Sequence, residues 1–415
     1  ALQATKVDLT PALKGEAATP GRGYGRYSLR NLMIVAQVSI SLVLLIGAGL
    51  FLRSLGQAQS IDPGFQMGNL LTMKLDTTVV GLEKEKSLGF YKGVLEQARA
   101  LPGVQSASLA SSSPLEVISG LRPVYVEGRE QRPGEENSYS FNIVAPDYFR
   151  TMGIAVVDGR EFTESDAEGS REVIIVNETM ARTFWPGQNP LGQRVSDQGA
   201  TGPFRVVVGV VKDSKYLTLG ESARPYYYIP IFQDLYPSAR LHVRAAGDPQ
   251  ALVAPVRNLV RGVNATVPIS NVLSGGEHLS LALLVPRLGA MLLGVSGLLA
   301  LVLVVIGLYG VMSYSVARRT QEIGIRMALG AQKRDVLLLV IKEGMGLVLV
   351  GLLLGLSAAF ALTRVLSSLL YGISATDPLT FLAVTAVLTL VALVATFIPA
   401  RRAVSVDPMI ALRYE

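Results

Sequence analysis

Residues able to carry out chemistry are few in this sequence. Its 415 residues include no cysteine, which excludes disulfides and thiolate metal sites, and only His242 and His278 could supply imidazole ligands. The sequence contains no Gly-x-x-x-x-Gly-Lys-Ser/Thr loop, no nucleophile elbow and no His-Glu-x-x-His motif. We therefore predict no catalytic, cofactor or metal site, and we interpret both histidines as ordinary surface or interface residues.

The uneven distribution of charge along the sequence predicts which structural elements the chain forms. The mean hydropathy is +0.40 although 17% of the residues are charged. Uncharged stretches lie near the two ends, and a polar sequence interrupted by Pro and Gly fills the middle. This pattern indicates a water-soluble domain placed between membrane spans. The net charge of +6 comes from basic residues beside the apolar stretches, so we interpret it as a determinant of membrane orientation and not as a nucleic-acid site.

Four uncharged runs are long enough to cross a hydrocarbon core, which needs about 20 residues. They predict transmembrane helices over residues 31–53, 287–317, 344–363 and 378–400. The second run is longer than a bilayer requires, so its first turns are expected to project as a stalk. Asp377 and Pro378 are expected to be the N-cap and first residue of the fourth helix.

Basic residues indicate the orientation of these helices. They concentrate in segments 1–30, 318–343 and 401–415, whereas the predicted external link 364–377 has no Lys or Arg from Val365 to Asp377, and the central segment 54–286 is long. The three basic segments are predicted to be cytoplasmic, with both termini inside and the central domain outside. The chain begins without a signal-peptide pattern, so the first span is expected to insert uncleaved.

The central segment has the periodicities of an α+β domain. Residues 87–100 and 249–263 follow the helical period, and residues 178–184 are expected to form a short helix. Val173–Val176 and Val206–Val211 are β-branched runs typical of strands. The segment is long enough for two lobes, whose boundary the sequence does not define.

The segment after the second span has the pattern of an amphipathic helix. From Ala317 it reads ARRTQEIGIRMALGAQKRDVLLLVIK, with Ile323, Met327 and Ala331 spaced by four and a break expected at Gly330. A helix lying on lipid explains this spacing. A helix docked in a groove of a cytoplasmic motor explains it equally well.

The sequence also resembles a known family. The segment RTQEIGIRMALGA resembles the cytoplasmic signature of MacB/FtsX-type ABC transporter permeases, and further similarity covers most of the chain from Leu32 onward. The motifs that carry it are DPGF (62–65), VAPDYFRTMGI (144–154), GREFTESD (159–166), VNETMARTFWPGQNPLGQRV (176–195), VVGVVKD (207–213) and TDPLTF (376–381).

The resemblance implies an α-helical membrane protein with four transmembrane helices and an α+β MacB-like periplasmic core domain between the first two. An FtsX-like permease domain would occupy residues 287–407. The chain would be the permease subunit of a transporter in the bacterial cytoplasmic (inner) membrane, transmitting the ATP-driven motion of a separate ATPase to the periplasmic domain for export or efflux. Its partners would be that ATPase, a second permease half, membrane lipid and a periplasmic adaptor.

Two groups of residues are predicted to carry this role. The residues expected to couple to the ATPase are Glu322, Ile323, Gly324, Arg326, Ala328, Leu329, Gly330 and Ala331. Gly351 and Gly355 form a GxxxG pattern that favours close helix packing. An FtsX-type signalling protein or regulator of envelope enzymes, without substrate transport, is the alternative function. A membrane-anchored enzyme is disfavoured by the missing catalytic motifs.

The two ends of the chain resemble each other. ALQATKVDLTPALKGE (1–16) aligns without gaps on ARRAVSVDPMIALRYE (400–415). We expect from this match that residues 1–30 are the tail of a preceding copy, and that the chain is the second half of a tandemly duplicated permease.

Overall fold

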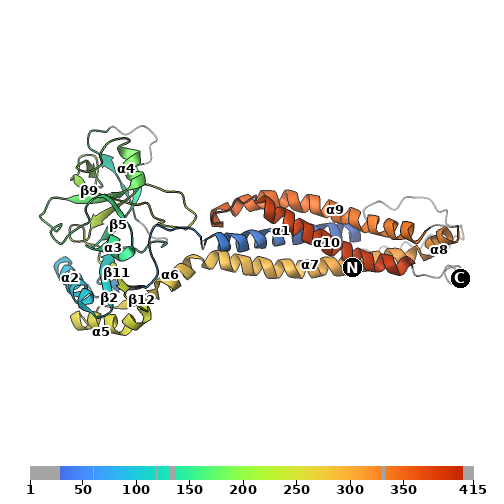
Figure 1. The fold of residues 1–415 in the computed structure, drawn as a ribbon, viewed down its shortest axis with the longest axis horizontal. Coiled ribbons are helices and arrows are strands. Elements are labelled where there is room, and N and C mark those ends of the chain that lie inside the picture. The colour runs from blue at the N-terminus through green and yellow to red at the C-terminus, as the bar shows by residue number, and fades with distance from the viewer. Residues whose placement is uncertain (1–28, 59, 117–119, 130–136, 330–331, 405–415) are drawn as a thin grey trace, which may run out of the picture. The chain divides into compact units, whose positions relative to one another are not determined.

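The computed structural model describes residues 29–58, 60–116, 120–129, 137–329 and 332–404 (Figure 1). The chain divides into two compact units. The helical unit consists of Ala1–Gly47, Leu293–Leu362 and Pro378–Glu415, and the α+β unit consists of Ala48–Leu292 and Thr363–Asp377. The expected match between residues 1–16 and 400–415 lies almost entirely outside the described residues.

Four helices in the described part are long and apolar enough to cross a membrane. They are α1 (Leu29–Ala58), α7 (Leu284–Arg318), α9 (Lys333–Val365) and α10 (Pro378–Val404). A mixed domain of helices and strands lies between α1 and α7 in the sequence, as predicted. α7 alone has 35 residues, so at 1.5 Å per residue it is about 52 Å long.

The helices extend beyond the uncharged runs. α1 continues past Arg53 to Ala58, and α9 begins at Lys333, ahead of the predicted start at Gly344. Lys, Arg and Glu are good helix formers. The uncharged runs therefore mark only the apolar part of each helix, whereas the backbone hydrogen bonding continues through the charged residues.

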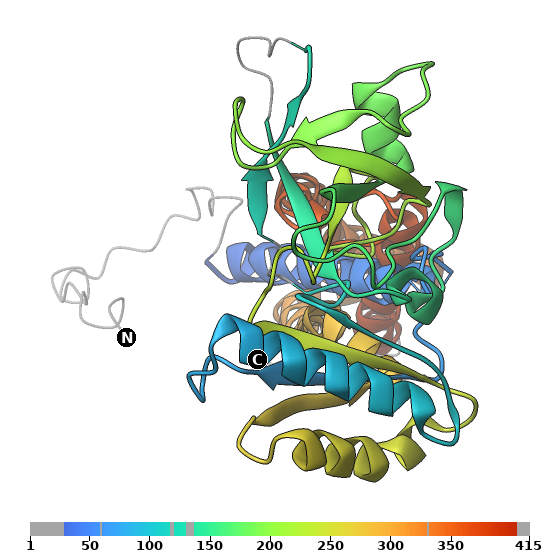
Figure 2. The same cartoon turned by 90° about the vertical axis from the view of Figure 1, so that its left-hand side faces the viewer.

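The first half of the α+β unit is a four-stranded antiparallel arrangement. The strands β1 (Leu70–Asp76), β2 (Val104–Ala110), β11 (Ser238–Ala245) and β12 (Ile269–Ser274) lie in the order β12-β1-β11-β2. The helices α2 (Lys84–Ala100) and α5 (Val253–Val263) connect them as β-α-β units and lie next to each other (Figure 2). The helix predicted from residue 249 begins as a 3₁₀ turn (Pro249–Leu252), which Asp248 caps through the N–H of Gln250.

The second half is inserted between β2 and β11. Its strands continue the same sheet in the order β5 (Ser138–Val144), β10 (Tyr226–Pro230), β7 (Val173–Asn177), β9 (Arg205–Val211), β8 (Arg194–Ser196) and β4 (Tyr125–Val126). In addition, β3 (Leu121–Pro123) pairs with β5, and β6 (Val156–Gly159) pairs with β9. The helices of this half are α3 (Tyr148–Met152) and α4 (Glu178–Phe184). Ala110 of β2 opposite Val144 of β5 joins the halves and locates the lobe boundary that the sequence leaves open. The predicted strands 173–176 and 206–211 and the predicted helix 178–184 correspond to β7, β9 and α4.

Both histidines are buried, contrary to the sequence interpretation. His242 lies in β11, and its Nε2 is 2.9 Å from the hydroxyl of Ser113. His278 lies in α6 (Gly275–Ala282) and donates from Nε2 to the carbonyl of Pro114 at 2.7 Å. The ring of Tyr148 in α3 packs edge-on against His242 with centroids 5.9 Å apart, so α3 and the loop after β2 cover this face of β11.

Candidate functional site

The predicted coupling segment forms α8 (Thr320–Ala328), a short helix directly after α7. The N–H of Arg319 donates to the carbonyls of Ser315 and Val316, which closes the last turn of α7. The hydroxyl of Thr320 donates to the carbonyls of Val316 (3.1 Å) and Ala317 (3.0 Å). These bonds satisfy carbonyls that the end of a helix would otherwise leave without partners.

The apolar face of α8 packs against the same chain. Ile323 is only 5% exposed and contacts Val336 of α9, which is also buried. Val316 of α7 and Met327 of α8 complete this cluster. Packing against α7 and α9 therefore fixes the orientation of α8, and Ile323 supports the helix from inside.

The opposite face of α8 is open to solvent. Arg326 donates to Glu322 at 2.6 Å, and both side chains are about half exposed. Leu329 is 83% exposed and Ile325 is 45% exposed. Sequence reasoning missed Ile325, although its spacing of four from Leu329 was a signal for a second apolar row.

The remaining predicted coupling residues are only partly described. Gly324 and Ala328 lie within α8. Gly330 and Ala331 fall between α8 and α9, outside the described residues. Arg319, just before α8, forms an ion pair of 2.9 Å with Glu343 of α9. Exposed ion pairs contribute little to stability, so the Ile323 cluster is the main attachment of α8.

Gly351 and Gly355 lie where α9 approaches α1. A Cβ added at Gly351 would be 2.8 Å from the Cβ of Val38, and one added at Gly355 would be 3.0 Å from the Cα of Ser39. Gly297 of α7 is equally close to α1, because its added Cβ would be 2.9 Å from Leu45. Small residues at these positions let helix backbones approach closely. α1 is accordingly the most buried of the four long helices.

The link between α9 and α10 is packed within the α+β unit. The N–H of Tyr371 donates to the hydroxyl of Ser54 near the end of α1, at 2.6 Å. Asp377, just before α10, pairs with Arg53. A Cβ added at Gly220 would be 2.9 Å from the Tyr371 ring, so the link also contacts the loop after β9.

Two separate sequence motifs meet at Asp213, after β9. One carboxylate oxygen accepts from the side chain of Asn177 (2.7 Å) and the backbone N–H of Thr179 (2.9 Å). The other accepts from the hydroxyl of Thr179 (2.7 Å) and from Arg182 (2.8 Å). The motifs VNETMAR and VVGVVKD thus hold the start of α4 against the end of β9, which is a structural role.

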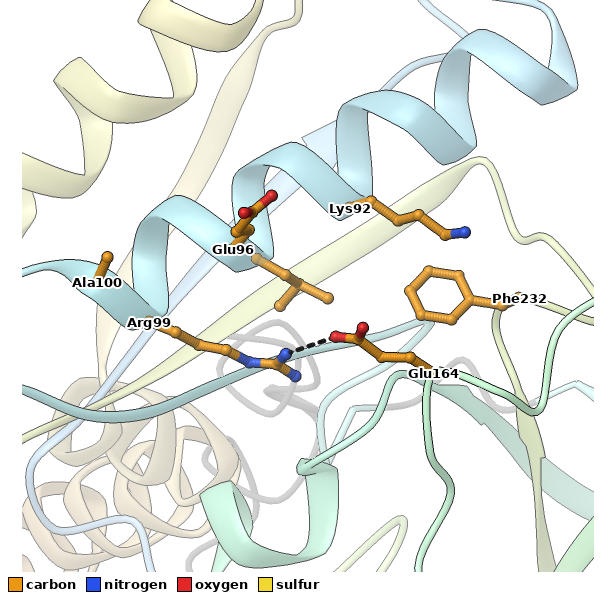
Figure 3. Close-up of a pocket in the computed structure, with 7 residues that line it drawn as sticks. Lys92, Glu96, Arg99, Ala100, Glu164 and Phe232 are labelled. Atoms are coloured by element: carbon orange, nitrogen blue, oxygen red, sulfur yellow. Dashed lines mark hydrogen bonds and ion pairs between the residues drawn. The ribbon is translucent and has the colours of Figure 1, made fainter.

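A cleft of about 720 Å³ separates α2 from the inserted half (Figure 3). Arg99 crosses it to Glu164 at 3.2 Å, and Lys92 lies 4.9 Å from the centre of the Phe232 ring. Glu96 adds a second carboxylate. The two basic and two acidic side chains balance, so the cleft has no net charge that would select a charged ligand.

Four membrane-crossing helices with a mixed α/β domain inserted after the first define a multi-pass membrane protein with an extracytoplasmic-type domain. Two family models match the chain: the MacB-like periplasmic core domain over residues 33–262, more than half of its length, and the FtsX-like permease C-terminal domain over residues 294–408. The chain belongs to the MacB/FtsX-type family of ABC transporter permeases.

Curated relatives agree with this assignment. The macrolide export ATP-binding/permease protein MacB of Acinetobacter baylyi is 28% identical over 74% of this chain and 47% of its own length. The uncharacterized ABC transporter permease YvrN of Bacillus subtilis is 26% identical over 66% of this chain and 69% of its own. The chain thus spans about half the length of that MacB protein. The crystal structure of the periplasmic region of MacB from Actinobacillus actinomycetemcomitans is 14% identical, covers 55% of this chain and 97% of that region, and gives a TM-score of 0.37.

Proposed function

We propose that this permease transmits the motion of a separate cytoplasmic ATPase to its α+β domain, and that this motion drives export. The observation that carries the proposal is the exposed face of α8. Its apolar underside is covered by α7 and α9, while Glu322, Arg326 and Leu329 are open. A helix that packs on its own chain along one face, and exposes both charged and apolar side chains on the other, is suited to docking on a protein.

Lipid is a poorer explanation of the same face. An interfacial helix needs a wide apolar face in the acyl region and positive charge towards the headgroups. In α8 the most buried apolar residue, Ile323, is already covered by Val336, and Glu322 would be repelled by an anionic membrane surface. A protein groove can use the Glu322–Arg326 pair and the neighbouring Leu329 together.

The relay in this proposal uses continuous helices. α7 leads directly from the α+β domain to α8, and α1 packs on α9 through Gly351 and on α7 through Gly297. A displacement of α8 would therefore move helices that lead to the α+β domain. Closely packed helices can pass a movement of α8 to the α+β domain, because helices that share a tightly packed interface move together.

The proposal includes orientation and partners. The basic segments 1–30, 318–343 and 401–415 would face the cytoplasm of a bacterium, and the α+β domain would lie outside the inner membrane. A second permease half would complete the transporter. A MacB relative carries both ATP-binding and permease functions in its name, which supports an ATPase as the partner in this proposal.

The proposal is tested by purification of the full-length protein from its native membrane and identification of bound subunits. Glu322→Lys, which reverses charge on the exposed face, and Ala328→Trp, which adds bulk, should both insert normally and lose the ATPase. Glu85→Lys, on the exposed start of α2, is the matched charge control and should retain it. Normal ATPase binding and transport by both α8 variants would reject the coupling role and favour the interfacial helix.

A further inference from the structure

A second cavity lies in the α+β unit, at the point where its chain leads into α7. It has a volume of about 630 Å³, within the range of small-molecule sites. Its walls come from the loop after β2, the loop after β9, β12, α6, the first turn of α7 and the link before α10. Its apolar lining includes Leu115, Leu219, Leu281, Ala282 and Val285. We call it the α6 cavity.

The walls of the α6 cavity suit an apolar ligand. Leucines and other apolar side chains dominate the lining, and its carboxylate and its imidazole already have protein partners. Glu116 pairs with Arg240 at 2.7 Å, and His278 donates to the Pro114 carbonyl at 2.7 Å. A polar ligand would therefore gain few new hydrogen bonds there and would lose those it makes to water.

Unusual backbone surrounds the same space. Four non-glycine residues of the described chain adopt a left-handed conformation, and two of them, Leu115 and Asn271, line this cavity. Asn is tolerated in that region, but Leu is not a residue that favours it. The N–H of Leu115 donates to the Tyr216 carbonyl at 2.7 Å, which holds this backbone in place. Such strained backbone concentrates at ligand sites.

The rim of the cavity continues into an exposed apolar surface of α7. Leu281 and Val285 on the rim are 53% and 57% exposed, and Leu288, Met291 and Leu292 beyond them are also exposed. Val285 lies only three residues, about 4.5 Å along the helix, before the uncharged run that begins at Leu288. A continuous apolar path therefore leads from the membrane-crossing part of α7 into the α6 cavity.

We propose that the α6 cavity binds one acyl chain of a membrane phospholipid. The chain enters past Leu281 and Val285 and ends against Leu115 and Leu219. These two leucines are 7% and 3% exposed, so a lipid that only lies along the outside of α7 cannot reach them. Contact with Leu115 or Leu219 therefore distinguishes a bound chain from ordinary surrounding lipid.

The test uses full-length protein in nanodiscs of phosphatidylethanolamine and phosphatidylglycerol. The probe is a phosphatidylethanolamine with a diazirine in one acyl chain, and adducts are mapped by peptide mass spectrometry. We expect adducts at Leu115 or Leu219. Ala282→Trp, which fills the cavity, should reduce them about tenfold. Leu292→Trp, on the exposed side of α7, is the matched control and should leave them unchanged.

A second variant keeps the test independent of the fit of a tryptophan. Leu281→Asn makes the exposed rim polar without adding bulk, and should also reduce adducts at the two buried leucines. Thermal unfolding of each variant establishes that the fold is intact, and if Ala282→Trp does not fold, Leu281→Asn decides. The proposal is overturned if the lipid probe labels α7 but neither Leu115 nor Leu219, or if cavity adducts persist in the folded variants. It is also overturned if only a six-carbon alkyl diazirine added from water labels the cavity.

Discussion

The hydroxyl of Ser39 in α1 donates a hydrogen bond of 2.8 Å to the carbonyl oxygen of Gly351 in α9. The same hydroxyl lies 2.8 Å from the carbonyl of Val35, one turn earlier in its own helix. The bond between helices is short because Gly351 has no Cβ to hold the two backbones apart. Ser39 and Gly351 therefore locate the closest approach of α1 and α9.

Substitution at this contact should separate the two helices. Gly351→Leu would place atoms against Val38, and we expect a loss of about 1–3 kcal/mol in stability through overpacking. Thermal unfolding of the protein in nanodiscs measures the effect. Gly346→Leu is the matched control on the same helix, because its added Cβ would have no atom of another described helix within 4 Å. Equal destabilisation by both variants would contradict the close packing at Gly351.

Two apolar residues of α8 should respond differently to the same change. Ile323→Asn buries an unpaired amide against Val336 and should destabilise the protein by about 1–3 kcal/mol. Leu329→Asn lies on the exposed face and should change stability by less than about 0.5 kcal/mol. In the proposed complex, Leu329→Asn should nevertheless weaken ATPase binding, measured by co-purification. Unchanged binding would remove Leu329 from the docking face.

The absence of cysteine from the sequence allows a direct test of orientation. Cysteine placed at Val79, which is 70% exposed in the α+β unit, should react in intact cells with a maleimide that does not cross the inner membrane. Cysteine placed at Leu329, which is 83% exposed, should react only after the membrane is opened. The reverse pattern would overturn the proposed topology.

Asp213 should be a strong determinant of stability in the α+β unit. Asp213→Ala removes four hydrogen bonds and leaves donors on Asn177 and Thr179 without their acceptor. We expect a loss of about 2–4 kcal/mol, measured by denaturant unfolding. Glu85→Ala, an exposed carboxylate on α2, serves as control and should change stability by less than about 0.5 kcal/mol.

Burial of His242 should make the α+β unit sensitive to acid. Burial, assisted by nearby His278 and Arg240, lowers the pKa of His242 from 6.5 to about 3. Between these values the unfolded chain binds a proton that the folded protein does not, so stability falls as the pH drops below 6.5. The expected loss is about 2–3 kcal/mol near pH 4.5.

The control for this prediction is the variant His242→Gln, which cannot titrate. Its thermal unfolding should lose less stability than the unsubstituted protein between pH 7 and pH 4.5. Carboxylates titrate in the same range in both proteins, so the difference between them isolates the histidine. An identical acid response would show that His242 takes up its proton without unfolding.

Periodicity and charge in the sequence determined the arrangement along the chain. Uncharged runs predicted four spans in the correct order, because any segment crossing hydrocarbon must be apolar for about 20 residues. β-branched runs predicted β7 and β9, and helical spacing predicted α2 and α4. The match of motifs to a family of permeases was also evident from local sequence and is supported by the two family models.

Only the tertiary structure decided which surfaces remain free. The spacing of Ile323 and Met327 predicted an apolar stripe but not which segment packs against it. In the fold Val336 covers that stripe, while Ile325 and Leu329 stay exposed. His242 was expected at the surface and is enclosed because Tyr148 and Ser113, which are distant in the sequence, pack against its ring. Contacts between residues far apart in sequence set these outcomes, and no local pattern encodes which distant segment will cover a given face.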